Sequence, residues 1–159
     1  MSALLFILQI SLWVAGGLLT LMVGYLVVLT IAAWWAPKRT PLPAGKATHR
    51  FVLLVPAHNE EQLLPTLLAN ISQLAYPRRL FTLVVVADNC TDQTAALARA
   101  AGALVYERFD RVQIGKGYAL QWVLAQLHAD QIKFDAAVIL DADSVVSANF
   151  LQVMAAQLT

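Results

Sequence analysis

The sequence predicts an α/β domain with a parallel sheet, preceded by one transmembrane helix. Two observations carry this expectation. Residues 2–36 contain no charged side chain and consist mainly of Leu, Val, Ile, Ala and Trp. After residue 50, four short apolar runs alternate with segments whose apolar residues recur at helical spacing. Strands that alternate with helices in this way form a parallel sheet with right-handed crossovers.

Residues 1–36 are expected to form a transmembrane anchor. About twenty apolar residues span a bilayer, so the segment is long enough for one crossing, and two would not fit comfortably. A cleaved signal peptide is the alternative. The segment lacks a basic amino-terminal region, and its apolar part exceeds the about 7 to 15 residues of a signal peptide. A retained anchor is therefore preferred.

The charge distribution predicts the side of the membrane on which the rest of the chain lies. Lys38, Arg39, Lys46 and Arg50 follow the apolar segment, whereas the first acid is Glu60. The positive-inside rule then predicts a single-pass protein of the cell (inner) membrane with its domain in the cytoplasm. Residues 37–49, with three prolines and a glycine, are expected to be a short linker.

The remaining composition excludes some partners. Seven basic and ten acidic side chains follow Arg50, a net charge of −3, which argues against nucleic acid. Cys90 is the only cysteine, so no internal disulfide can form, in agreement with a reducing cytoplasm. We interpret Cys90 as a small packing residue.

The first half of the domain is expected to contain two strands and two helices. A strand over 51–55 is closed by Pro56, and a helix over 60–74 is capped by Asn59. The second strand covers 80–87. The next helix covers 93–101, is capped by Thr91 or Asp92, and ends at Gly102 in a left-handed conformation.

The second half repeats the pattern. A third strand covers 103–106, and a polar loop over 107–115 contains Arg108. A helix opens near Gly115-Lys116-Gly117. The fourth strand, 136–140, reads as buried on both faces and delivers Asp141 and Asp143 to its carboxyl end. A last helix covers 148–158.

The strand order 3-2-1-4 would make strands one and four neighbours whose helices leave on opposite faces. Such a switch point is where open α/β sheets bind ligands, and it would place residues 56–60 beside residues 141–143. Two carboxylates one residue apart suit a hard cation such as Mg²⁺ or Mn²⁺. No G-x-G-x-x-G or G-x-x-x-x-G-K-[ST] motif is present.

Four segments, in this order and at about this spacing, resemble the amino-terminal half of family 2 glycosyltransferases with the GT-A fold. They are Pro56-Ala57-His58-Asn59-Glu60, Ala87-Asp88-Asn89-Cys90-Thr91-Asp92, Gly115-Lys116-Gly117 and Asp141-Ala142-Asp143. The resemblance implies that residues 50–159 form a Rossmann-like parallel sheet, the nucleotide-sugar-binding half of a GT-A domain truncated at its carboxyl end. It also implies a nucleotide-sugar donor, usually UDP-linked, and a glycan or lipid acceptor.

The resemblance also implies roles for individual residues. Pro56, Ala57 and Glu60 would line the nucleoside pocket, and Asp88 would accept a hydrogen bond from the base. Lys116 would lie near the base or diphosphate, Asp141 on the ribose and metal side, and Asp143 on a Mg²⁺ or Mn²⁺ ion. The catalytic base would lie beyond Thr159, so donor binding rather than turnover is expected from this chain alone.

Each role has a structural alternative: a first-turn acid for Glu60, a turn residue for Asp88, and a solvated helix-start lysine for Lys116. His58 is interpreted as structural rather than as a base, since no partner for it is evident. A haloacid-dehalogenase-type phosphatase with Asp141 as nucleophile is a second hypothesis, although such a strand normally opens its domain. A membrane-tethered nucleotide-binding domain without catalysis is the third.

Overall fold

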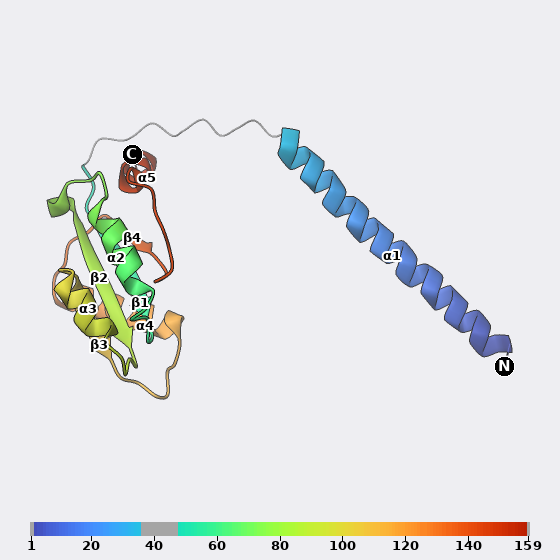
Figure 1. The fold of residues 1–159 in the computed structure, drawn as a ribbon, viewed down its shortest axis with the longest axis horizontal. Helices are drawn as coiled ribbons and strands as arrows, with labels where there is room; N and C mark the ends of the chain where they lie inside the picture. The colour runs from blue at the N-terminus through green and yellow to red at the C-terminus, as the bar shows by residue number, and fades with distance from the viewer. Residues whose placement is uncertain (1, 36–47, 159) are drawn as a thin grey trace. The chain divides into compact units, whose positions relative to one another are not determined.

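The computed structural model describes residues 2–35 and 48–158 (Figure 1). It divides the chain into two units, Met1–Pro41 and Leu42–Thr159, which we describe separately. The predicted linker at 37–49 lies outside the described residues, apart from its last two positions.

The first unit is one helix, α1 (Ser2–Trp35), of 34 residues. At a rise of 1.5 Å per residue it measures about 51 Å, longer than the roughly 30 Å hydrocarbon core of a bilayer. The hydroxyl groups of Ser11, Thr20 and Thr30 each donate to a backbone carbonyl three or four residues earlier, at 2.8 Å. These hydroxyls therefore need no water. Ala3–Trp35 is a candidate membrane span.

The second unit contains a four-stranded parallel sheet, which confirms the predicted α/β fold. The strands are β1 (Phe51–Ala57), β2 (Phe81–Asp88), β3 (Leu104–Arg108) and β4 (Ala136–Ile139). Their order is β3-β2-β1-β4, as the sequence predicts. Because β1 pairs with both β2 and β4, the switch point lies at the carboxyl end of β1.

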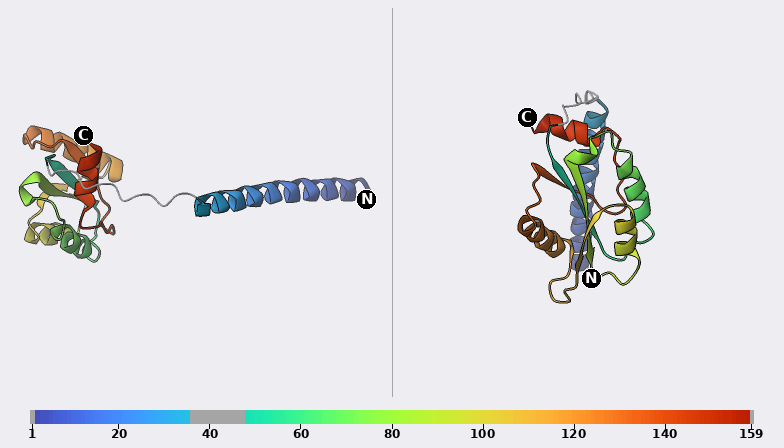
Figure 2. Two further views of the ribbon diagram at one scale, coloured as in Figure 1. Left: turned by 90° about the horizontal axis from the view of Figure 1, so that it is seen from above. Right: turned by 90° about the vertical axis from the view of Figure 1, so that its left-hand side faces the viewer.

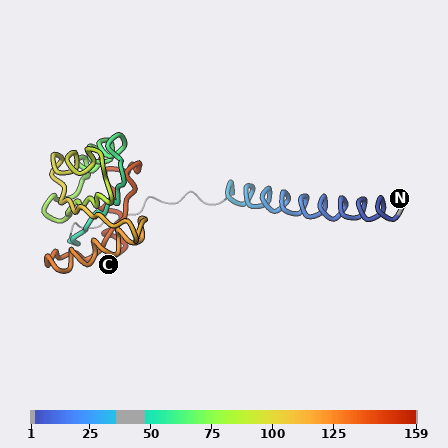
Figure 3. Tube along the Cα trace, turned by 90° about the horizontal axis from the view of Figure 1, so that it is seen from below, coloured from blue at the N-terminus to red at the C-terminus, as the bar shows by residue number. Residues whose placement is uncertain are grey.

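Helices cover both faces of this sheet (Figure 2). They are α2 (Leu64–Ser72), α3 (Thr94–Ala100), α4 (Lys116–Ala129) and α5 (Phe150–Gln157), with a short 3₁₀ turn at Arg78–Leu80. In Figure 3, α4 (orange) runs along the side of the sheet opposite α2 and α3 (green and yellow). This arrangement follows from the strand order, because the crossover from β3 to β4 passes back over the far face.

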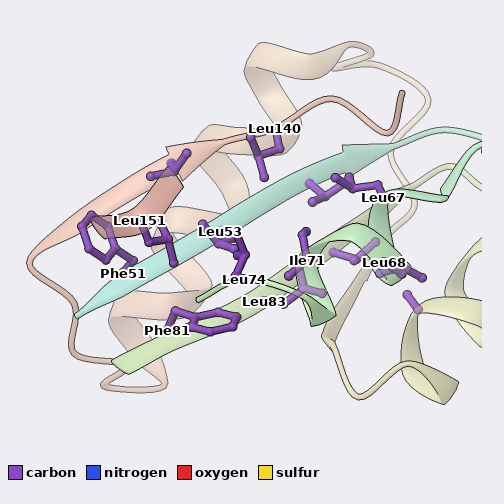
Figure 4. Close-up of a cluster of buried hydrophobic side chains, with 14 of the residues drawn as sticks. Phe51, Leu53, Leu67, Leu68, Ile71, Leu74, Phe81, Leu83, Leu140 and Leu151 are labelled. Carbon is purple, nitrogen blue, oxygen red and sulfur yellow. The ribbon is translucent and has the colours of Figure 1, made fainter. Parts of the chain in front are cut away.

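The core divides into two layers because alternate residues of β1 point to opposite faces. Phe51, Leu53 and Val55 pack against α2 and α5, in the cluster that Figure 4 shows. Val52 and Leu54 pack against Ala119, Val123 and Leu127 of α4, which recur every four residues. Both layers are almost fully buried, so β1 is a central strand and its carboxyl end is firmly held.

Pro56 does not close β1, which continues to Ala57. The Leu54 carbonyl accepts a hydrogen bond from the Leu140 backbone N–H at 2.9 Å, so Leu54 faces β4. Pro56, two residues later, faces the same side, but β4 ends at Ile139, paired with Leu54. The next ladder hydrogen bond would need an N–H at position 56, which proline lacks, so the pairing of β1 with β4 goes no further.

β4 is buried on one face only, contrary to the expectation. Val138 is buried on the α2 side, whereas Ile139 is 51% exposed. Ala137 and Ile139 are register partners of Val52 and Leu54, so they lie on the α4 face. α4 packs against β1 and β2, which leaves this face of the edge strand β4 uncovered within residues 48–158.

Candidate functional site

The carboxyl ends of β1, β2 and β4 and the start of α4 enclose a pocket of about 360 Å³ at the switch point. Six of the seven predicted site residues line it, namely Pro56, Ala57, Glu60, Asp88, Lys116 and Asp141, together with His58, Ile114, Gly115 and Ala119. Asp143 is not among them. A second pocket of about 430 Å³ lies around Arg50 and Phe134, at the amino end of the sheet. Parallel α/β sheets bind ligands at the opposite end, so the first pocket is the candidate site.

The loop after β1 is tied to the loop after β2 by hydrogen bonds. Asn59 Oδ1 accepts from the Thr91 backbone N–H at 2.8 Å, and the Glu60 N–H donates to Thr94 Oγ1 at 2.8 Å. The Glu61 N–H donates to Asp92 Oδ2, and the Gln93 N–H to Glu61 Oε2, both at 3.1 Å. These four bonds hold Glu60 at the pocket wall.

Asn59 is therefore not the helix cap that the sequence predicts. Its φ is +55°, a left-handed conformation that Asn tolerates well, and α2 begins only at Leu64. The predicted cap of α3 at Thr91 or Asp92 is also wrong, because the cap position is Gln93 and makes no side-chain cap bond, although Asp92 Oδ1, one residue earlier, accepts from the Thr94 N–H at 3.0 Å. Desolvation raises the pKa of Asp92, but hydrogen bonds from Thr94 and Glu61 outweigh it and leave the pKa below its ordinary value.

His58 and Cys90 make further hydrogen bonds between the ends of β1 and β2. His58 Nδ1 lies 2.7 Å from the Asp88 carbonyl oxygen, which can only accept, so Nδ1 carries the proton. The Cys90 thiol donates to the Ala57 carbonyl at 3.4 Å. Burial raises the pKa of Cys90, which keeps it a thiol.

Asp88, which lines the pocket, forms a buried ion pair that the sequence does not predict. Arg108 Nη1 lies 2.7 Å from Asp88 Oδ1, and the two side chains are only 4% and 9% exposed. Arg108 was expected in a polar loop, but it is the last residue of β3 and the register partner of Asp88 on β2. The signal in the sequence is limited to an acid and a base that each follow an apolar run, and the register that pairs them is seen in the structure.

Arg108 also holds the loop between β3 and α4. Its Nη2 donates to Asp110 Oδ2 at 2.9 Å and to the Gln113 carbonyl at 2.7 Å. Asp110 Oδ1 accepts from the Val112 and Gln113 N–H groups at 2.8 and 2.9 Å. The Gln113 and Val112 N–H groups, and then the Arg108 charge, hold the pKa of Asp110 below its ordinary value. The loop is thus closed around one ionised carboxylate.

The loop ends where α4 begins. Gly115 has a φ of +119° and a ψ of 161°, a conformation open in practice only to glycine. Lys116 follows in the first turn of α4 and forms an ion pair with Oδ1 of Asp141. The two side chains are 50% and 59% exposed, so this contact is open to solvent.

The carboxylates after β4 lie on a short turn. The Ser144 N–H donates to the Asp141 carbonyl at 2.9 Å, and Ser144 Oγ accepts from the Asp141 N–H at 3.1 Å. Asp143 is exposed. Within residues 2–35 and 48–158, no group of three or more His, Cys, Asp or Glu side chains could hold a metal ion. Two carboxylates fit a Mg²⁺ or Mn²⁺ ion only if water and ligand oxygens complete its coordination.

Comparison with known proteins relates the second unit to a known family. The model of the glycosyltransferase-like family 2 matches residues 49–159. A curated relative, 4,4'-diaponeurosporenoate glycosyltransferase of Staphylococcus haemolyticus, is 34% identical over 103 residues, 62% of this chain and 25% of the relative. The chain therefore spans about a quarter of that protein.

Solved structures share the fold. The mannosyltransferase PcManGT of Pyrobaculum calidifontis, in complex with GDP-Man and Mn²⁺, is 25% identical with a TM-score of 0.63, over 84% of this chain and 39% of that one. Glucosyl-3-phosphoglycerate synthase of Mycobacterium tuberculosis, in complex with UDP, is 28% identical with a TM-score of 0.52, over 70% and 41%. The same synthase has been solved with Mn²⁺, UDP-glucose and phosphoglyceric acid.

Proposed function

Because this chain belongs to the glycosyltransferase-like family 2, we propose that its second unit binds a nucleotide-sugar donor in the pocket at the switch point, for transfer of the sugar to an acceptor. One observation carries the proposal. Four segments far apart in the sequence bring Pro56, Glu60, Asp88, Lys116 and Asp141 to a single pocket of about 360 Å³. Convergent polar groups in a concave site are typical of a small polar ligand.

Asp88 supports a specific choice of base. Its Oδ1 accepts from Arg108 and from Asn89, whereas Oδ2 has no donor among the described residues. No fully buried side-chain nitrogen or oxygen of those residues lacks a partner, so Oδ2 is not fully buried, and Asp88 lines the pocket. A carboxylate oxygen accepts only, and uracil and guanine offer a ring N–H where cytosine and adenine offer an acceptor. We therefore propose that Oδ2 accepts from the ring N–H of uracil or guanine, which favours UDP-linked or GDP-linked donors, although the amino groups of cytosine and adenine are also donors, and we favour UDP.

The other side of the pocket suits a diphosphate. Lys116 supplies a positive charge, and the N–H groups in the first turn of α4 supply donors with the positive end of the helix dipole. Asp141 and Asp143 would share a Mg²⁺ or Mn²⁺ ion with the diphosphate oxygens. When bound, such an ion would neutralise the charge that builds up on the leaving diphosphate.

The acceptor and the general base are not assigned to residues of this pocket. The chain spans 25% of its curated relative, and we propose that acceptor-side residues, including the base, belong to the remainder of such a protein. We further propose that α1 anchors the chain in the cell membrane with the second unit at the cytoplasmic face, because the basic residues gather after α1. The acceptor would then be a glycan or lipid reached from that face.

The direct test is calorimetric titration of the full chain, in detergent, with UDP in the presence and absence of Mn²⁺. We expect Mn²⁺ to strengthen UDP binding at least about tenfold, since two carboxylates and a diphosphate complete one coordination sphere. Asp143→Asn should remove that gain, and Glu107→Gln, an exposed acid outside the pocket, should keep it.

The alternatives give different results. If the wild-type chain showed no metal-dependent UDP binding, the proposal would be contradicted and a membrane-tethered scaffold domain without catalysis would be favoured. A phosphoaspartate trapped on Asp141 would instead support the phosphatase hypothesis, which the family assignment does not favour.

A further inference from the structure

We propose that Arg108 is a positioning residue that sets both walls of the donor pocket at once. The inference rests on the function proposed above and assigns a role to a side chain that does not line the pocket. It starts from three contacts of one guanidinium group, at 2.7, 2.9 and 2.7 Å, to Asp88, Asp110 and the Gln113 carbonyl.

The first contact aims Asp88. Arg108 Nη1 and Asn89 Nδ2, at 2.7 and 3.2 Å, both donate to Oδ1 of Asp88. Because these two donors restrain Oδ1, they also restrain the orientation of the carboxylate. Oδ2 is then the oxygen that remains for a ligand. A charge-assisted hydrogen bond between two buried groups is stronger than a neutral one, so the Asp88 side chain is held firmly in this orientation.

The other two contacts hold the loop that carries Lys116 to the pocket. Nη2 of Arg108 binds the Asp110 carboxylate and the Gln113 carbonyl, two residues before Gly115. Asn89 closes the same unit, since its side chain accepts from the Asp110 N–H at 2.9 Å and donates to the Asp110 carbonyl at 3.0 Å. The base side and the phosphate side of the pocket thus meet at one planar group.

The geometry explains why the residue is arginine. A guanidinium presents several N–H donors in a fixed plane, so Nη1 can point to β2 while Nη2 points to the loop. A lysine ammonium carries the same charge on one nitrogen and cannot hold both sites with fixed directions. Substitution of Asp110 should therefore weaken the loop contact of Arg108 and leave its contact with Asp88 in place.

Two ratios measure these functions. The ratio of UDP affinity to CDP affinity reports the aim of Asp88, because cytosine presents an acceptor where uracil presents an N–H. The ratio of UDP affinity to UMP affinity reports the loop, because only UDP has the second phosphate for Lys116. A purely structural loss would lower every affinity and leave both ratios unchanged.

The experiment uses the full chain with Mn²⁺ and four variants. Arg108→Met should lower the UDP-to-CDP ratio by about tenfold, as expected for loss of a hydrogen bond to a charged group, and should also lower the UDP-to-UMP ratio. Asp110→Asn should lower the UDP-to-UMP ratio and leave the UDP-to-CDP ratio intact. Arg108→Lys should fall between wild type and Arg108→Met. Arg99→Met, which removes the exposed pair with Glu107, should change neither ratio.

The outcomes are distinguishable. Wild-type ratios in Arg108→Lys would show that charge alone suffices and would overturn the inference, as would unchanged ratios in Arg108→Met. Should the methionine variant not fold, the lysine and Asp110 variants still decide. Failure of the wild-type chain to bind UDP would overturn the proposed function, and this inference with it, whereas binding without the expected shifts overturns the inference alone.

Discussion

Nζ of Lys116, in the first turn of α4, forms an ion pair with Oδ1 of Asp141, which lies beyond the end of β4. The pair joins two segments 25 residues apart across the mouth of the pocket. Both residues have proposed partners in the bound state, a phosphate for Lys116 and a cation for Asp141. In the unbound chain the Lys116 ammonium group therefore lies where the cation would bind Asp141. The Asp141 carboxylate lies where the phosphate would bind Lys116.

Lys116→Met should separate these two effects. Without the ammonium group, Asp141 is free to meet a cation, so the affinity for Mn²⁺ alone should rise up to about threefold, a small change because exposed ion pairs contribute little. The affinity for UDP should fall about tenfold, since the diphosphate loses its charged partner. Titration of each ligand into the full chain measures both, and Lys133→Met, at the amino end of the sheet, is the matched control. If Lys116→Met weakened the binding of both Mn²⁺ and UDP, the idea that the two ligands replace the Lys116–Asp141 ion pair would be contradicted.

Arg108→Met should destabilise the second unit by about 3–5 kcal/mol, because it leaves the Asp88 carboxylate buried without its charged partner. Arg99→Met, which breaks the exposed pair with Glu107, should cost no more than about 1 kcal/mol. Amide hydrogen exchange of β1 and β2, followed by mass spectrometry, measures both. Adding Asp88→Asn to Arg108→Met should recover part of the loss, and equal costs for the two arginines would rule out a major role for the buried pair.

Gly115→Ala and Gly117→Ala should have opposite effects. Gly115 has a positive φ, so alanine there should cost about 1–3 kcal/mol of backbone strain, although its added carbon meets no atom within 4 Å. Gly117 lies inside α4 and its added carbon also meets nothing, so alanine there should stabilise the helix by up to about 1 kcal/mol. Hydrogen exchange of the α4 amides reads out both. Stabilisation of α4 in both variants would show that the Gly115 conformation is not strained for alanine, and destabilisation in both would contradict the expected gain at Gly117.

Tyr106 makes stability depend on alkaline pH. Burial first, and then the hydrogen bond and charge of Asp130, raise the pKa of Tyr106 to about 12. Since the pKa in the unfolded chain is about 10, the neutral phenol favours the folded state. Its contribution is complete below pH 10 and is lost as the pH rises from about 10 to 12. The difference in melting temperature between wild type and Tyr106→Phe should shrink over that window, and a constant difference would contradict the coupling.

The strand order was predictable because alternating strands and helices leave few topologies for a parallel sheet. The gathering of Pro56, Asp88 and Asp141 at one sheet edge follows from the same rule. The ligand roles of these residues remain a prediction. Pattern alone could not place Arg108, because a charged residue after an apolar run reads as a loop. Its burial depends on Asp88 at the same register of the neighbouring strand.

Two further differences have the same origin in tertiary contacts. Asn59 has the residue type of a cap, but its side chain finds Thr91 of another loop and leaves the start of α2 without it. Ile139 lies in an apolar run that reads as doubly buried. The apolar run does not reveal that β4 is an edge strand of the sheet, whose outer face α4 does not cover.

The hydrogen bonds between the loops after β1 and β2 have a consequence for how such chains diversify. They fix this side of the pocket during folding, so little ordering remains there for the moment of binding. The opposite side rests on one solvent-exposed ion pair. Under the proposed function, substitutions on that side can change how the diphosphate and its metal ion are held while the base-binding side is inherited unchanged.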